Sequence, residues 1–338
     1  MSKDIAIDLG TSNTRLWVRG EGLVLDLPTV VAVRTWRSGR REIVHLGHDA
    51  RALLGRTPAG MDVIRPVRGG HIGDPVVARA LLLHLFRLVH HRRAAVRPRV
   101  LSLVEPDAPR PTDMSLREAL LHAGARSVSP VYKPVAALLG AGLDPHDPTG
   151  RLIIDVGGGT TQISLLSQGR VVASCTLDLG GEVLEGALVR ALKRDHALQI
   201  GPATACDLKA MALDAQKVHI AGRCVRSGLP RAAQIPGSEL RDALREPLLA
   251  IAIGVRRLLE TAPGELASDV AAQGALIVGG CSRIRGVPEL LGEATGLAML
   301  CVESPDHVAI SGAGQLLDQW PSMPWVRPES TLLPSALV

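Results

Sequence analysis

The sequence predicts an α/β protein of two duplicated domains, and two glycine-rich segments far apart in the chain are the main evidence. The first reads IAIDLGTSNTRLWV and the second reads LIIDVGGGTTQISLL. Each contains an apolar strand, an aspartate, a tight glycine turn and a second β-branched strand. One such turn alone would indicate only a hairpin, whereas a matching pair favours a duplication. With 46% hydrophobic residues in a chain of 338, both domains can have cores of their own.

Both turns carry residue types that suit a phosphate chain. Glycines let backbone N–H groups converge on one point, and threonine hydroxyls add further donors. These residues are Gly10, Thr11, Asn13 and Thr14 in the first turn, and Gly157, Gly158, Gly159 and Thr160 in the second. The preceding aspartates, Asp8 and Asp155, would hold a hydrated Mg²⁺. Two opposed turns would clamp a nucleoside triphosphate, and the alternative is that the glycines only form tight turns.

The first domain is predicted to span residues 1–146. Its residues 4–34 alternate β-branched and apolar residues, which predicts three antiparallel strands, and the polar stretch 35–74 predicts a small inserted subdomain. Pro75 suits the start of a helix through ARALLLHLFRLVHHRR, whose apolar residues recur every three or four positions. The remaining expected elements are a strand at 100–104, a helix at 116–122 and a small-residue helix at 134–142.

The second domain is predicted to span residues 147–320, because the strand–turn–strand pattern restarts after DPTG. Gly180 and Gly181 open a helix that is expected to reach Leu192. A second inserted subdomain is expected at 182–245, of which the part from residue 201 onward is polar and suggests irregular structure. A helix at 239–261, the strand ALIVGG and the helix GVPELLGEAT follow, and then a Pro-containing tail at 321–338.

The order and spacing of these segments resemble those of MreB, the bacterial actin family, along nearly the whole chain. Matching stretches include KDIAIDLGTSNTRLWVRGEGLVLDLPTVVAV, DPTGRLIIDVGGGTTQISLLSQGRVV, ALIVGGCSRIRGVPELLGEATGL and ESPDHVAISGAGQLLD. The resemblance implies the actin-like ATPase fold of the actin/Hsp70/sugar-kinase superfamily. That fold has two RNase H-like domains, each with a small inserted subdomain.

The resemblance also implies that ATP and Mg²⁺ bind between the domains. Asp8 and Asp155 would orient the hydration shell of Mg²⁺, and the two turns would hold the β- and γ-phosphates from opposite sides. The other residues implied are Gly180 and Gly181 for phosphate or ribose, Gly279 and Gly280 for adenine, and Lys209 for ribose.

The chain departs from the family pattern where a glutamate positions the attacking water. The family has Glu-Glu-Pro, and this chain has Tyr132 and Lys133 before the proline. Tyrosine is a poor base at neutral pH and lysine adds a positive charge, so we expect slow or absent ATP hydrolysis. Thr161 remains as a contact for the water. Glu105, in LVEP at a strand end, is the candidate substitute.

Departures on the adenosine side predict weakened nucleotide binding. Cys206 stands where the ribose-binding glutamate is expected, and Asp207 is one position out of register, which rotates it about 100° on a helix. Cys281 replaces the third glycine of the adenine motif. The stretch 213–218 looks shortened, so a hairpin there is expected to be reduced.

Composition limits the compartment and the partners. Four tryptophans, one tyrosine and one phenylalanine leave few stacking platforms, which argues against binding of single-stranded nucleic acid. Five cysteines without CxxC or zinc spacing indicate a reduced compartment. Neither a signal peptide nor an apolar run of about 18 residues is present, so we expect a cytoplasmic protein.

A weak, electrostatic contact with the inner face of the cell membrane is suggested by the loop HHRRAAVRPRV. It places arginines around residues 94–96, where the family has a small apolar membrane loop. Each arginine near an anionic leaflet contributes on the order of 1 kcal/mol. The alternative is a solvated helix end whose cations complement the helix dipole.

The resemblance therefore implies a filament-forming, ATP-binding actin that associates with itself or related bacterial actins. Its partners would be cell-wall synthesis proteins, and its role would be cell shape. The alternative is a degenerate actin-like protein that co-assembles without a nucleotide cycle. A sugar kinase would need a long sugar-binding insertion and an Hsp70 chaperone a peptide-binding domain, and neither fits in 338 residues.

Overall fold

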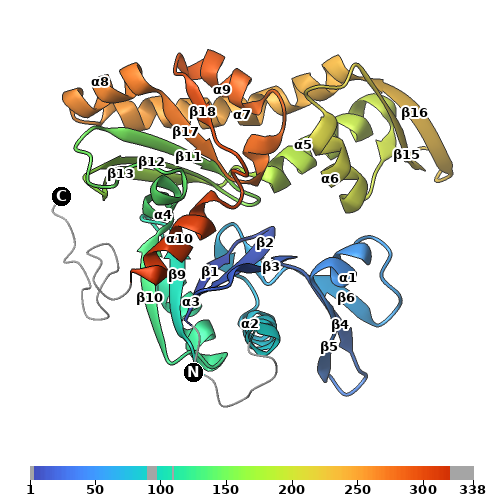
Figure 1. The fold of residues 1–338 in the computed structure, drawn as a ribbon. Helices are drawn as coiled ribbons and strands as arrows, with labels where there is room; N and C mark the ends of the chain where they lie inside the picture. The colour runs from blue at the N-terminus through green and yellow to red at the C-terminus, as the bar shows by residue number, and fades with distance from the viewer. Residues whose placement is uncertain (1–3, 90–96, 109, 320–338) are drawn as a thin grey trace.

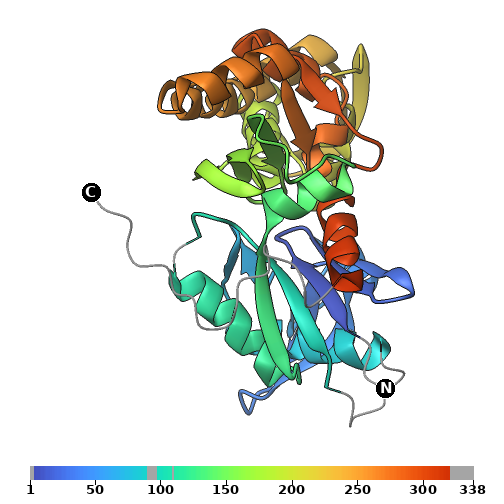
Figure 2. The same ribbon diagram turned by 60° about the vertical axis from the view of Figure 1, so that its left-hand side comes forward.

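The structure, a computed structural model, describes residues 4–89, 97–108 and 110–319. Two lobes lie one above the other in Figure 1, and they meet along helices α4 (Lys133–Gly140) and α10 (Val308–Asp318). The chain builds the lower lobe first and then the upper lobe. It returns to the junction through α10, which Figure 2 shows between the lobes.

Each lobe is built on a five-stranded sheet, and the two sheets share one topology. Their strand orders are β10-β9-β1-β2-β3 and β18-β17-β11-β12-β13. In both sheets three consecutive strands pair antiparallel, and two later strands add parallel to the first of them. This shared topology confirms the predicted duplication.

The strands of the lower sheet are β1 (Ile5–Leu9), β2 (Asn13–Val18), β3 (Gly22–Pro28), β9 (Arg99–Val104) and β10 (Ser127–Tyr132). Those of the upper sheet are β11 (Arg151–Val156), β12 (Thr161–Ser167), β13 (Arg170–Leu177), β17 (Ala275–Val278) and β18 (Met299–Cys301). The three antiparallel strands predicted for residues 4–34 are therefore present as β1, β2 and β3.

Both faces of each sheet are buried because helices cover both. In β1, Ile5 and Ile7 pack with α2 (Pro75–Val89) and α3 (Arg110–His122), whereas Ala6 packs with α4 and α10. The period of two in a strand produces this alternation. Since the inner face of the upper sheet also packs on α4 and α10, these helices form the floor between the lobes.

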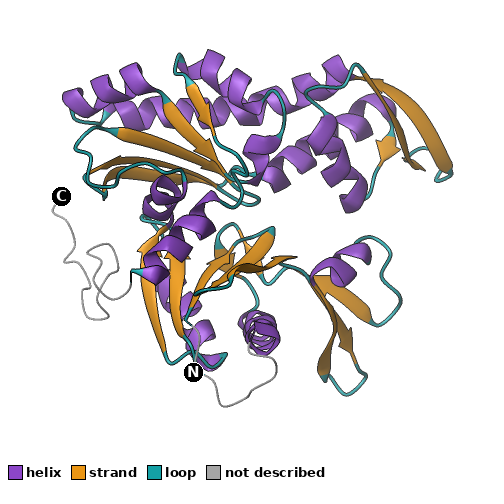
Figure 3. Ribbon diagram, viewed as in Figure 1, coloured by secondary structure: helices purple, strands orange, loops and turns teal. Residues whose placement is uncertain are grey.

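Helices, drawn purple in Figure 3, cover the outer face of the upper sheet. They are α5 (Gly181–His196), α7 (Gly237–Glu260), α8 (Gly264–Gln273) and α9 (Val287–Thr295). Among the residues that the structure describes, no helix is both long and apolar enough to cross a membrane.

Each lobe also carries a small unit at the right of Figure 1. The lower unit contains β4 (Val31–Thr35), β5 (Arg41–Leu46), α1 (Gly47–Ala52) and β6 (Met61–Ile64). The upper unit contains β14 (Leu198–Gln199), α6 (Pro202–Met211), β15 (Lys217–Cys224) and β16 (Pro230–Pro236).

The irregular structure predicted from residue 201 onward is wrong, whereas the shortening of the hairpin relative to the family stays a prediction. The stretch forms α6 and then the paired strands β15 and β16. Ile220 in β15 and Ile235 in β16 are buried, and both side chains join the core of the upper lobe. The hairpin has many exposed polar residues, so the short alternation of buried and exposed positions in its strands was not recognised in the sequence.

Two predictions concern residues outside the described part of the chain. The central residues of the proposed membrane loop, 90–96, and the tail 321–338 both lie there.

Candidate functional site

A cavity of about 970 Å³ lies between the lobes, within the size range of small-molecule sites. The predicted turns line it from opposite lobes, at the ends of β1 and β11. Of the predicted binding residues, its wall includes Asp8, Gly10, Thr11, Asn13, Asp155, Gly157, Gly158, Gly159, Thr160, Lys209, Gly279 and Gly280.

The two turns have the same internal hydrogen bond. The amide of Gly10 donates to the carbonyl of Asn13 over 3.0 Å, and the amide of Gly157 donates to the carbonyl of Thr160 over 2.9 Å. Each bond closes a tight hairpin that holds the intervening backbone toward the cavity. The duplication seen in the sheets therefore extends to the site.

The tips of the turns approach so closely that they need glycine. A Cβ atom on Gly159 would lie 2.6 Å from Thr11 Oγ1 and 3.0 Å from the amide nitrogen of Gly69. A Cβ atom on Gly158 would collide with the Ser12 side chain. The cavity thus narrows to a slot between the two turns, where a linear chain of phosphates would fit.

Gly180 and Gly181 lie behind the second turn, where the start of α5 supports it. The amide of Gly181 donates to the Gly157 carbonyl over 3.0 Å, and the amide of Glu182 donates to the Gly158 carbonyl over 2.8 Å. A Cβ atom on Gly180 would lie within 2.8 Å of this turn's backbone. Neither glycine belongs to the cavity wall.

Two predicted threonines also turn away from the cavity. The hydroxyl groups of Thr14 and Thr29 form a hydrogen bond with each other, with 2.8 Å between the two oxygens. Thr161 is fully buried, and its hydroxyl donates to the carbonyl of Leu179 over 2.5 Å. Thr161 is thus not part of the cavity wall, and its contact with an attacking water stays a prediction.

Each aspartate next to a turn has a basic neighbour. Lys133 Nζ lies 2.8 Å from Asp155 Oδ2, and Arg15 Nη1 lies 3.9 Å from Asp8 Oδ2. Burial alone would lower the pKa of Lys133, but the charges of Asp155 and Asp8 more than offset this and raise it. Lys133 is therefore a charged ammonium. Its neighbour Tyr132 packs against the core between the lobes instead.

The predicted Mg²⁺ shell does not fit this arrangement. Lys133 already holds one oxygen of Asp155. The other, Oδ1, is buried beside Gly279 without a hydrogen-bond partner among the described residues, and a Cβ atom on Gly279 would collide with it. A hydrated cation would compete with the ammonium for the same carboxylate.

Glu105 lies in the cavity just after β9. Its carboxylate accepts a hydrogen bond from Thr160 Oγ1 over 3.2 Å, and Thr176 Oγ1 lies 3.4 Å away but donates to Asp107 Oδ1 over 2.7 Å. Burial raises its pKa; the charge of Lys133 opposes this rise, and the charges of Asp155 and Asp107 add to it. A carboxylate with a raised pKa inside a cavity is a candidate general base.

The opposite end of the cavity contains a polar pair that the sequence reasoning only half identified. Lys209 Nζ lies 2.7 Å from Glu185 Oε1, and both residues line the cavity. Glu185 was missed, although its position one helical turn after Gly181 on α5 was a usable signal. Cys206 and Asp207 both line the wall, so the rotation expected for Asp207 does not remove it from the site.

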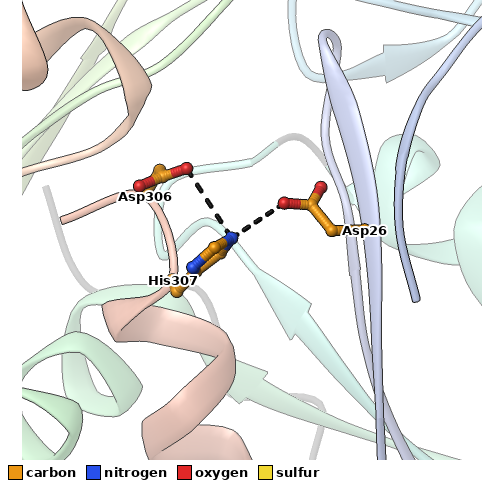
Figure 4. Close-up of side chains that lie close together, drawn as sticks. All are labelled: Asp26, Asp306 and His307. Atoms are coloured by element: carbon orange, nitrogen blue, oxygen red, sulfur yellow. Dashed lines mark hydrogen bonds and ion pairs between the residues drawn. The ribbon is translucent and has the colours of Figure 1, made fainter. Parts of the chain in front are cut away.

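A cluster of ion pairs that was not predicted lies beside the first turn (Figure 4). His307 Nε2 lies 2.8 Å from Asp26 Oδ2 and 3.7 Å from Asp306 Oδ2. Arg15 lies 3.3 Å from both aspartates, and Arg283 lies 3.2 Å from Asp306. Arginines already balance these carboxylates, and the cluster ties β3 to the start of α10.

Comparison with known proteins gives one consistent result. Residues 2–323 match the family model described as "MreB/Mbl protein". The cell shape-determining protein MreB of Escherichia coli K12 is 37% identical over 94% of each chain. The cell shape-determining protein Mbl of Bacillus subtilis 168 is 33% identical over 96% of this chain and 98% of its own.

Solved structures agree with the sequence relatives. MreB5 of Spiroplasma citri bound to AMPPNP superposes with a TM-score of 0.87 at 28% identity, covering 94% of this chain and 96% of its own. A double helical MamK filament gives a TM-score of 0.78 at 23% identity, covering 94% and 99%, and supports the actin-like fold alone. With its full-length sequence match and this fold, the chain belongs to the MreB/Mbl family of bacterial actins.

Proposed function

We propose that this protein binds ATP in the cavity between its lobes and assembles with itself, or with related bacterial actins, into filaments. The observation that carries the proposal is the pair of opposed turns, residues 8–14 and 155–160, at one cavity. MreB5 of Spiroplasma citri, which has the same fold, was crystallised with AMPPNP and with ADP. Its nucleotide complexes support a nucleotide site here.

The cavity residues divide into two groups by the chemistry they offer. Thr11 and Asn13, with the backbone amides of the two turns, offer donors to the β- and γ-phosphates. Lys209 and Glu185 at the other end suit the hydroxyl groups of ribose, and the backbone at Gly279 and Gly280 suits a flat base. This division assigns the triphosphate to the slot between the turns and the nucleoside to the upper lobe.

The cellular role that we propose is organisation of cell-wall synthesis and cell shape. The relatives from Escherichia coli and Bacillus subtilis are named cell shape-determining proteins. We place the filaments in the cytoplasm, in weak electrostatic contact with the inner face of the membrane. The arginine-rich loop in the sequence supports this placement.

Hydrolysis of the bound ATP is proposed to be slow. At the start of α4 the cavity meets an ammonium group instead of a carboxylate, and Tyr132 packs into the core. Loss of a water-positioning group costs about two or more orders of magnitude in rate. Glu105 is the acidic group that could sustain residual turnover.

Polymer sedimentation with ATP, with ADP and without nucleotide tests the proposal. We expect ATP to increase the pelleted fraction and calorimetry to show ATP binding. Gly159→Ala should weaken that binding at least about tenfold, because the new Cβ pushes the turns apart. Gly264→Ala is the matched control, because a Cβ atom added to Gly264 on α8 would meet no other atom within 4 Å.

Phosphate release from the same preparations tests the slow turnover. The double variant Tyr132→Glu/Lys133→Glu should release phosphate faster than the wild type if the rest of the site is intact. A protein that stays monomeric with ATP on anionic lipid, and binds no nucleotide, would instead be the degenerate actin without a nucleotide cycle.

A further inference from the structure

The ammonium of Lys133 lies in an acidic part of the cavity wall. Its Nζ is 2.8 Å from Asp155 Oδ2, and the side chains of Lys133 and Asp155 are only 21% and 9% exposed. Asp8 and Glu105 line the same cavity. One buried cation therefore faces carboxylates from both lobes, at the point where the two turns converge.

A phosphate chain needs positive charge at this point. Asp8 and Asp155 precede the turns, and their charges alone would repel a triphosphate. In many nucleotide sites a hydrated divalent cation neutralises both the carboxylates and the phosphates. Here Lys133 has already neutralised Asp155, and Arg15 lies beside Asp8.

The ammonium also has donors to spare. A lysine ammonium is a compact charge with three N–H donors, and one of them serves Asp155. Because Lys133 lines the cavity, its remaining donors are left for an anionic ligand there. The position of Asp155 is restrained as well, because its Oδ1 packs against Gly279, which leaves Oδ2 to Lys133.

We propose that Lys133 takes the place of the divalent cation, so that the cavity binds nucleoside di- and triphosphates without Mg²⁺. The inference rests on the proposed nucleotide binding and deepens it: the ligand is the metal-free nucleotide. The counter-ion is then part of the chain, anchored on α4.

The test is calorimetric titration of the full-length protein with AMPPNP, in buffer with Mg²⁺ and in buffer with EDTA. For the wild type we expect the two dissociation constants to agree within about threefold. Lys133→Glu removes the built-in cation and adds a carboxylate. It should therefore bind AMPPNP at least about tenfold more weakly in EDTA than in Mg²⁺.

Two further variants complete the design. Lys133→Arg keeps the positive charge and should remain independent of Mg²⁺. Lys217→Glu makes the same charge change at an exposed position of β15 and should behave as the wild type. Circular dichroism establishes that each variant is folded, and the wild-type comparison is decisive even where a variant does not fold.

The outcomes separate this inference from the proposed function. Wild-type binding that falls tenfold or more on chelation overturns the role of Lys133 and leaves nucleotide binding intact. Absence of binding in both buffers overturns the proposed function, and this inference with it. Equal affinity in both buffers, lost on chelation only in Lys133→Glu, supports the built-in cation.

Discussion

At the scale of single residues, burial decides how Glu105 behaves. Its raised pKa means that the folded protein disfavours the carboxylate more than the unfolded chain does. For an acid with a raised folded pKa, stability falls as pH rises from the unfolded to the folded pKa. At neutral pH and above, Glu105 therefore reduces the free energy of unfolding, as groups retained for function often do.

We expect Glu105→Gln to stabilise the protein at pH 8 while lowering any residual ATP turnover by about 100-fold or more. The gain in stability should shrink as pH falls toward the usual glutamate pKa of 4.5, because below that value the acid is neutral in both states. Urea unfolding at pH 8 and pH 5, with a phosphate-release assay, measures both effects. Glu246→Gln, an exposed position on α7, is the control. A loss of stability at pH 8 would contradict the inferred penalty.

At the scale of elements, the crossing of α4 and α10 sets the distance between the lobes. A Cβ atom on Gly312 would run into the carbonyl oxygen of Ala136, and one on Gly140 would run into that of Val308. The two backbones are therefore in direct contact. The sequence predicted a small-residue helix for close packing, and α10 is the partner in this packing.

Replacing Gly312 with alanine should destabilise the protein by about 1–3 kcal/mol, because the helices must separate to admit the methyl group. Gly186→Ala, inside α5, is the matched control: its Cβ would meet only the flexible end of Arg190, at 3.2 Å. There alanine should be neutral or stabilise by up to about 1 kcal/mol. Urea unfolding of the two variants compares them, and equal effects would show that the crossing is not tightly packed.

At the scale of the whole molecule, the lobes also touch across the mouth of the cavity. Arg65 Nη1 lies 2.7 Å from Glu182 Oε1, and Arg51 donates to Cys206 Sγ over 3.2 Å. These contacts join the small lower unit to α5 and α6, far from the floor formed by α4 and α10 (Figure 1). We expect these contacts to restrain separation of the two small units.

We expect Arg65→Ala to speed nucleotide release by up to about fivefold, because a partly exposed ion pair contributes roughly 0.2–1 kcal/mol. Stopped-flow displacement of a fluorescent ATP analogue measures the release rate. Arg285→Ala breaks a more exposed pair with Asp214 outside the cavity and should leave the rate unchanged. If Arg65→Ala and Arg285→Ala behave alike, the pair across the mouth does not restrain opening.

Within the site, the residues that could be predicted are those whose role depends on local backbone. Gly10, Gly157 and their neighbours form turns whose chemistry follows from adjacent residues. The positions of Gly181 and Thr161 behind the cavity wall could not be predicted in this way, because their hydrogen bonds go to Gly157 and Leu179, which neighbouring elements bring into reach. Hydrogen-bond partners from neighbouring elements depend on packing, and residue spacing alone does not predict them.

The sequence by itself determined the α/β class, the duplication and the two phosphate-type turns, because strand alternation and turn chemistry are properties of short segments. Only the tertiary structure decided that the ammonium of Lys133, and not an empty acidic site, faces the slot between the turns. That ion pair joins residues from α4 and β11, whose side chains meet only after the helix has docked beneath both sheets. How α4 docks depends on the packing of the whole core, and the positive charge that Lys133 brings to this site depends on that docking.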